Sequence, residues 1–256
     1  MRYYKGYIAI SDERDIPILL HIRNARAVSF DQLCGLLKHD EIETLRRSVH
    51  WRVSRLEKAG LIERFEQDRF FGQPVFAITP LGLALLESRG QYMVALPSTI
   101  ERVIHRSQLF HALELVNIRL SLARNGILRS WKTEVEITSR NLVLEHSNAK
   151  DYDAVVEVSI AGESRIFAIE YERTAKASAR YKEIRELLSS DKTVETVLYL
   201  TSNHDVLYLL AVELRGVAKQ IGIALSDQFR RDLLKTQTLR VGAADDVIEF
   251  RDLIAQ

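Results

Sequence analysis

Apolar residues follow helical spacing through the first part of the chain. Between positions 15 and 22, isoleucine and leucine recur on one helical face, which predicts a first helix. Ser29 is placed to cap the N-terminus of a second helix that runs through Leu37. A third helix is predicted in "EIETLRRSVHWRVSRLEKAG", where Gly60 is suited to the C-terminal cap.

Two short apolar segments follow, with residues typical of a loop between them. The segments "GLIERFEQ" and "QPVFAIT", separated by "DRFFG", predict a β-hairpin. Pro80 then stands in the first turn of a further helix, where proline is tolerated. Three helices followed by a hairpin is the element order of a winged helix-turn-helix. The stretch "RVSRLEKAGLIERF" also resembles the recognition-helix end and first wing strand of the winged-helix transcription regulators, which implies DNA binding.

The third predicted helix has one apolar face and one polar face. At about 100° per residue, the apolar stripe consists of Leu45, Val49, Val53 and Leu56. The opposite face carries Arg47, Trp51, Ser54 and Lys58, with Arg46 and Arg55 at its edges. Such a face is typical of a helix that reads the major groove, since arginine binds guanine edges and cations bind phosphates. In the hairpin, Arg64 and Arg69 are placed to contact phosphates or the minor groove.

Two other interpretations of the polar face stay open. Nearby acids such as Glu43 and Glu57 would make its arginines part of a solvated surface. Trp51 would also suit a helix that packs under the second domain or a partner subunit. The helix-turn-helix order favours DNA reading.

The second half of the chain alternates between strand-like and helical segments. Pro97 lies in an aperiodic stretch, so we predict domains at 1–95 and 107–256 with a linker at 96–106. A long helix in "SQLFHALELVNIRLSLARNG" precedes the predicted strands "WKTEVEI", "YDAVVEVSI" and "RIFAIEYE", the last two forming a hairpin across "AGES". The segment "TAKASARYKEIRELLSS" is predicted as a helix, "VETVLYLT" as a strand, "DVLYLLAVELRGVAKQIG" as a helix and "IGIALS" as a closing strand.

Helix, three strands, helix and strand is similar to the core order of the PD-(D/E)xK nuclease superfamily. The resemblance implies that an aspartate at the start of the second strand and an acidic residue at the end of the third share a Mg²⁺ ion. Asp153 and Glu170 match these positions, and Glu114 matches an additional carboxylate on the preceding helix. The expected fold is thus a two-domain α+β or α/β protein, with an N-terminal winged helix-turn-helix and a PD-(D/E)xK-like αβββαβ domain.

One position departs from the nuclease pattern. Glu172 stands where the superfamily has a lysine, and a glutamate cannot offset the negative charge that develops during phosphodiester cleavage. Lys176 or Lys182, from the next helix, is placed to supply that charge instead. The alternative is that these strand-end acids are simply solvated.

A resemblance to a further family covers most of the chain. The segments "LFHALELVNIRLSL" and "DYDAVVEV…RIFAIEYERTAKASARYKEI" are similar to the replication-relaxation family of plasmid-associated proteins. The positions that carry it are His111, Asp153, Glu170, Glu172, Thr174 and Tyr181. Glu172 replaces the usual aspartate, and Tyr152 replaces the usual proline. The resemblance implies DNA binding linked to control of plasmid replication or mobilisation.

The composition of the chain limits the kinds of binding site and cellular location that it can have. A formal net charge of +1 means that DNA binding must come from a local basic face. Cys34 is the single cysteine, which excludes an intramolecular disulfide and a zinc site built on several thiolates. No run approaches the roughly 18 apolar residues of a membrane span, so we expect a cytoplasmic protein without membrane partners.

Three functions are compatible with these patterns. The first is a sequence-specific regulator that binds double-stranded DNA as a homodimer, without a cofactor, and whose nuclease-like domain serves dimerisation or partner binding. The second is a Mg²⁺-dependent DNA endonuclease with Asp153, Glu170 and Glu172 as catalytic residues and Glu114, Asp153 and Glu170 as metal ligands. The third is an adaptor whose second domain mainly binds protein. The lost lysine favours the regulator.

Overall fold

The computed structural model of the protein describes residues 8–65, 72–144, 150–242 and 246–255. Side-chain caps fix where two helices of its first part begin. The Ser29 side chain accepts a hydrogen bond from the backbone of Gln32, and the Ser29 backbone donates one to the Gln32 side chain. Thr79 caps a later helix that has Pro80 in its first turn. The predicted starts of both helices are therefore confirmed.

The chain divides into two compact units, residues 1–116 and 117–256. The division falls within one helix, between Val116 and Asn117. The linker expected at 96–106 stays a prediction.

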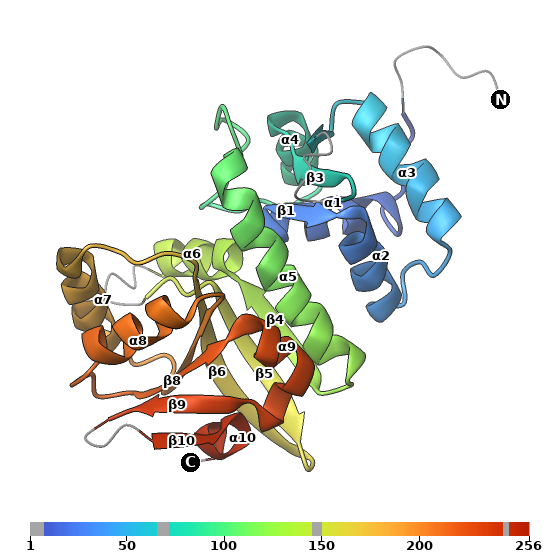
Figure 1. The fold of residues 1–256 in the computed structure, drawn as a ribbon. Helices are drawn as coiled ribbons and strands as arrows, with labels where there is room; N and C mark the ends of the chain where they lie inside the picture. Colours follow the sequence, from blue (N-terminus) through green and yellow to red (C-terminus); the bar gives the residue numbers. More distant parts are fainter. Residues whose placement is uncertain (1–7, 66–71, 145–149, 243–245, 256) are drawn as a thin grey trace. The chain divides into compact units, whose positions relative to one another are not determined.

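The first unit contains four complete α-helices, the first half of α5 (Leu109–Arg124) and a three-stranded sheet within its described residues (Figure 1). Its elements are α1 (Asp15–Ala25), β1 (Ala27–Ser29), α2 (Phe30–His39), α3 (Arg46–Lys58), β2 (Ile62–Phe65), β3 (Val75–Ile78) and α4 (Pro80–Ser88), followed by a 3-10 turn, η1 (Arg106–Gln108). Strand β3 lies between β1 and β2 and is antiparallel to both. The pairing of β2 with β3 confirms the predicted hairpin, while its loop at 66–71 lies outside the described residues.

Helix α3 starts at Arg46, five residues after the start of the predicted segment at Glu41. Val49, Val53 and Leu56 are buried, as expected. Leu45 is 67% exposed, so its predicted burial was wrong. The reason is local, since Leu45 has extended backbone angles and precedes the first helical residue, Arg46.

The second unit is built on a seven-stranded mixed sheet. Helix α5 (Leu109–Arg124) enters it, and its strands are β4 (Leu128–Thr133), β5 (Ala154–Ile160), β6 (Glu163–Glu172), β7 (Thr196–Thr201), β8 (Gln220–Leu225), β9 (Gln237–Val241) and β10 (Asp246–Glu249). The strand order is β10-β9-β8-β7-β6-β5-β4. The pairs β6–β7 and β7–β8 are parallel, and the other neighbouring strands are antiparallel.

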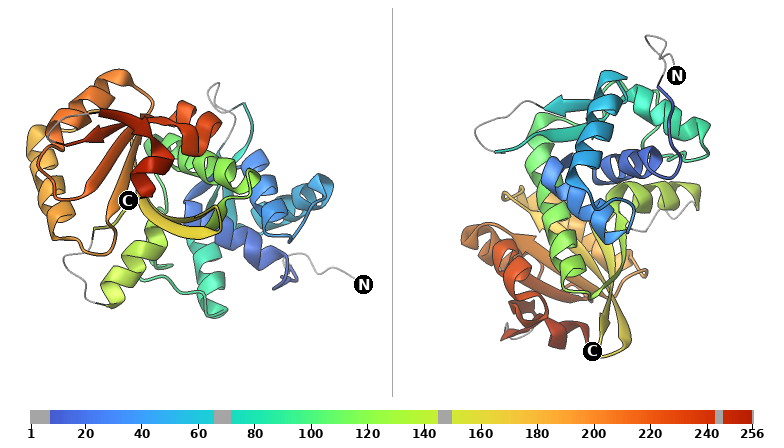
Figure 2. Two further views of the ribbon diagram at one scale, coloured as in Figure 1. Left: turned by 90° about the horizontal axis from the view of Figure 1, so that it is seen from below. Right: turned by 90° about the vertical axis from the view of Figure 1, so that its right-hand side faces the viewer.

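Helices cover both faces of this sheet (Figure 2). They are α6 (Glu134–Val143), α7 (Ser178–Ser190), α8 (His204–Glu213), α9 (Ser226–Asp232), the 3-10 turn η2 (Leu233–Lys235) and α10 (Phe250–Ile254). Helices α7 and α8 pack on the face of β6 that carries Ala168. Phe167 points to the opposite face, where its ring packs edge-on against the Phe250 ring with 4.9 Å between the ring centres. The alternation follows from the two-residue period of a strand.

Several predicted segments change type or length. The segment "WKTEVEI" is a strand only as far as Thr133, because Thr133 and Glu136 form a capping box that starts α6. Helix α7 begins at Ser178, later than predicted, and α8 ends at Glu213, earlier than predicted. The segment "IGIALS" covers β8 except for its first residue, Gln220, and β8 lies inside the sheet because β9 and β10 follow beside it.

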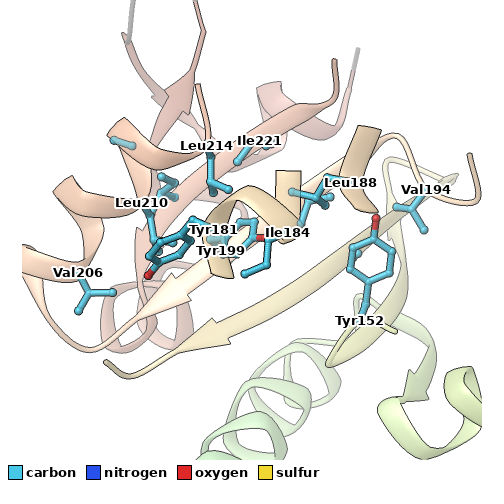
Figure 3. Close-up of a cluster of buried hydrophobic side chains, with 14 residues drawn as sticks. Tyr152, Tyr181, Ile184, Leu188, Val194, Tyr199, Val206, Leu210, Leu214 and Ile221 are labelled. Atoms are coloured by element: carbon cyan, nitrogen blue, oxygen red, sulfur yellow. The ribbon is translucent and has the colours of Figure 1, made fainter. Parts of the chain in front are cut away.

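A buried cluster joins the sheet to α7 and α8 (Figure 3). Three tyrosines, Tyr152, Tyr181 and Tyr199, are almost completely buried in it. Buried tyrosine hydroxyls normally find hydrogen-bond partners. The Tyr152 hydroxyl donates to the Asp191 carboxylate at 2.7 Å, so this apolar cluster also contains polar contacts next to the strand-end acids.

Candidate functional site

One stripe of α3 carries side chains that are exposed or partly exposed. Arg47, Trp51 and Lys58 are exposed, and Ser54 is partly exposed. Within the described part of the chain, Arg47 and Lys58 have no carboxylate partner. These four positions form the face that the sequence predicts for DNA reading.

The flanking arginines are held differently. Arg46 forms an ion pair with Asp31, and its guanidinium lies 4.7 Å from the centre of the Phe30 ring. Arg64 is exposed on β2, while Arg69 lies outside the described residues. Arg46 thus differs from Arg47 in being paired within its own unit.

Arg55 is anchored to the protein itself. Its Nη2 donates to the backbone oxygen of Ala9 at 2.7 Å, and its Nη1 lies 3.9 Å from the buried Asp15 carboxylate. Arg52 also donates to Asp15, at 2.8 Å. The Arg55 guanidinium lies 4.4 Å from the centre of the Trp51 ring, so Arg55 holds the tryptophan in place.

The strand-end acids of the second unit meet where β5 begins and β6 ends. The register places Ala154 opposite Ile169, which brings Asp153 next to the end of β6. Asp153 Oδ2 accepts a hydrogen bond from the Tyr171 backbone at 2.7 Å. Glu170 and Glu172 point to the same face of β6, because they are two residues apart in a strand. Asp153 and Glu170 are therefore close to each other, which the sequence left open.

Two lysines neutralise the glutamates. Lys150 binds Glu170, and Lys176 binds Glu172. Lys176 was one of two lysines expected near this site, and it lies before α7. The other, Lys182, is exposed on α7. Lys150 was not predicted, since its approach to Glu170 depends on the turn into β5.

Burial controls the protonation of Glu170. It raises the pKa of the carboxyl from its ordinary value to about 7, the Lys150 ammonium lowers that pKa, and the Asp153 carboxylate raises it. Tyr199 lies opposite Glu170 on β7. Burial and the charge of Glu170 raise the pKa of Tyr199 well above its ordinary value. Within the described residues, the buried Tyr199 hydroxyl has no hydrogen-bond partner.

Comparison with known proteins bears on the resemblance seen in the sequence. A model of the replication-relaxation family matches residues 19–186, which is more than half of the chain. The chain belongs to the replication-relaxation family. The match confirms the predicted family and includes both the α3 face and the strand-end acids.

Other comparisons add less. No curated protein matches this family member. The solved structure of restriction endonuclease FokI is similar over 86% of this chain, with 10% sequence identity and a TM-score of 0.31. The match spans 43% of the FokI chain, and a likeness this distant carries no argument here.

Positions tied to the family resemblance have different roles in the structure. The Tyr181 hydroxyl accepts a hydrogen bond from the Lys176 backbone at 3.2 Å, which positions Lys176 beside Glu172. Thr174 is exposed. His111 and Glu114 lie on α5 within the 1–116 unit, and their roles stay predictions.

The acids do not fit a bound metal ion well. Among the described residues, no three His, Cys, Asp or Glu side chains are grouped so as to hold one. Glu170 and Glu172 already have lysine partners. Separately, none of the described helices has both the length and the hydropathy needed to span a membrane.

Proposed function

We propose that this protein is a sequence-specific regulator that binds double-stranded DNA and controls replication, mobilisation or transcription of a plasmid or mobile element. In this proposal, α1 to β3 form a winged helix-turn-helix, and α3 enters the major groove. The stripe of Arg47, Trp51, Ser54 and Lys58 carries the proposal, because its cations are exposed and unpaired among the described residues. DNA in the cytoplasm is the partner, and no cofactor is required.

The second unit has a structural role in this proposal. Its PD-(D/E)xK-like sheet serves dimerisation or the binding of a protein partner. Lysines balance Glu170 and Glu172, so these carboxylates need no cation from solution. A symmetric dimer would bind half-sites about one helical turn apart.

Arg47→Ala is expected to weaken DNA binding and to relax sequence preference. An arginine that binds a guanine edge is worth roughly 1 to 3 kcal/mol. A duplex is first selected from a randomised library with the wild-type protein, and its affinity for each variant is measured by fluorescence anisotropy at fixed salt.

The matched control for this measurement is Arg165→Ala. It removes the same charge from an arginine that pairs with Glu163 at the end of the β5–β6 hairpin. The control should bind like the wild type. Equal affinity of the Arg47 variant and the control would remove Arg47 from the reading face.

One observation favours a second candidate, a DNA endonuclease that its winged helix delivers to a site. Asp153 and Glu170 are adjacent, and the Lys150 ammonium beside them supplies a positive charge that Glu172 does not. Mg²⁺ would be its cofactor. The lysine-neutralised glutamates argue against this candidate.

Supercoiled plasmid incubated with the protein is expected to be shifted but not cut, with Mg²⁺, Mn²⁺ or EDTA present. Asp153→Ala should give the same shift, since Asp153 is not part of the proposed DNA-binding face. Gel electrophoresis separates nicked from supercoiled plasmid. Metal-dependent nicking that is lost in Asp153→Ala would make the endonuclease correct, and no affinity for duplex DNA would favour the adaptor.

A further inference from the structure

The N-terminal end of α3 carries an apolar concavity. It has a volume of about 470 Å³ and is lined by Leu45, Arg46, Arg47, Ser48 and Trp51. Leu45 is 67% exposed and Trp51 is 53% exposed. Large apolar side chains grouped on a surface commonly mark an interaction site.

The walls of this concavity are held in place from below. The indole of Trp51 lies over the Arg55 guanidinium, which the Ala9 carbonyl and Asp15 hold. The backbone nitrogen of Leu45 donates to Glu43 at 3.0 Å, which fixes the start of the helix. A surface that is already ordered loses little conformational freedom when it binds.

We propose that this concavity receives the 5-methyl group of a thymine in the major groove of duplex DNA. The inference rests on the proposed function and names the base feature that the helix reads. A recognition helix contacts base edges mainly through its N-terminal residues, which is where Leu45 and Trp51 lie. In the major groove, the thymine methyl is the apolar group that distinguishes one base pair from another.

Charge complementarity favours DNA over an apolar protein partner. Arg47 lines the concavity, and Lys58 and Arg64 are exposed on α3 and on the strand that follows it. No carboxylate among the described residues pairs with these three cations. Arg47 beside the concavity, with Lys58 and Arg64 further along the same part of the chain, matches a groove whose edges are phosphates.

The test replaces thymidine by deoxyuridine, which removes only the 5-methyl group. The probe is the duplex selected from a randomised library with the 256-residue chain, with one thymidine replaced at a time. At one or more positions, wild-type affinity should fall about fourfold, the equivalent of burying one methyl group. Trp51→Ala and Leu45→Ala should each bind the thymine duplex more weakly and lose this discrimination.

Tyr208→Ala is the control, because Tyr208 is an aromatic residue on α8 that is 65% exposed. It should keep both affinity and discrimination. A wild type that selects a sequence but binds thymine and uracil duplexes equally overturns the inference alone. A wild type that selects no sequence overturns the proposed function with it. Variants that change the oligomeric state but not uracil discrimination show that a second copy covers the concavity, which also overturns the inference.

Discussion

As pH rises from about 4.5 to 7, the free energy of unfolding is expected to fall by about 3 kcal/mol more in the wild type than in Glu170→Gln. Burial raises the pKa of Glu170 from 4.5 to about 7 in the folded protein. Between these values the folded state binds more protons than the unfolded state. The contribution of Glu170 to the free energy of unfolding is therefore fully present below pH 4.5 and is lost as pH rises through 7. Glutamine does not titrate, so the variant lacks this loss.

The measurement needs a signal from the second unit. The chain has two tryptophans, Trp51 and Trp131, so Trp51→Phe leaves Trp131 on β4 as reporter. Urea unfolding at several pH values, in this background with and without Glu170→Gln, gives the free energies.

Glu163→Gln is the control for this titration, since Glu163 is an exposed carboxyl on the same strand. It should follow the wild type. Parallel pH dependences of the wild type and Glu170→Gln would show that folding does not shift the pKa of Glu170. The expected result would mean that the Glu170 carboxyl is partly protonated near neutral pH. The site then has less negative charge, which fits a site that does not bind cations.

In the first unit, features that depend on residues close in sequence were predicted, and contacts between residues far apart in sequence were not. The side-chain caps at Ser29 and Thr79 depend on residues three positions away, so the sequence contains them completely. Strand β1 was missed because three residues cannot show a period. The ion pairs of Arg46 with Asp31 and of Arg55 with Asp15 were not predicted, because the partners in each pair are distant in sequence.

The acidic site was predictable only in part. The short "AGES" turn fixes the β5–β6 hairpin, and that hairpin brings Asp153 to the end of β6. The approach of Lys150 to Glu170 depends on three-dimensional packing and leaves no spacing pattern. The short strands β9 and β10 have little alternation and were missed. In "WKTEVEI", the capping box at Thr133 outweighed strand propensity.

The first turn of α4 packs too closely against the segment that follows α3 to allow a side chain at Gly82. A Cβ there would lie 2.1 Å from the Leu61 backbone oxygen and 2.7 Å from Ile78 Cγ1. The Leu61 oxygen accepts a hydrogen bond from the Thr79 backbone at 3.1 Å. Thr79 Oγ1 also donates to the Gly60 oxygen at 2.6 Å, directly after α3. An added methyl group would therefore displace the segment that leaves the proposed reading helix.

Gly82→Ala is expected to destabilise the first unit by about 2 kcal/mol. Overpacking costs roughly 3 kcal/mol when backbone must move, and the helix propensity of alanine offsets about 1 kcal/mol of this. Urea unfolding followed by Trp51 fluorescence in a Trp131→Phe background measures the loss, and anisotropy should show weaker DNA binding. Gly242→Ala is the control, because a Cβ there meets no atom of the described residues within 4 Å. If Gly82→Ala were as stable as this control, the corner would tolerate a side chain, and the position of α3 would not depend on its contact with α4.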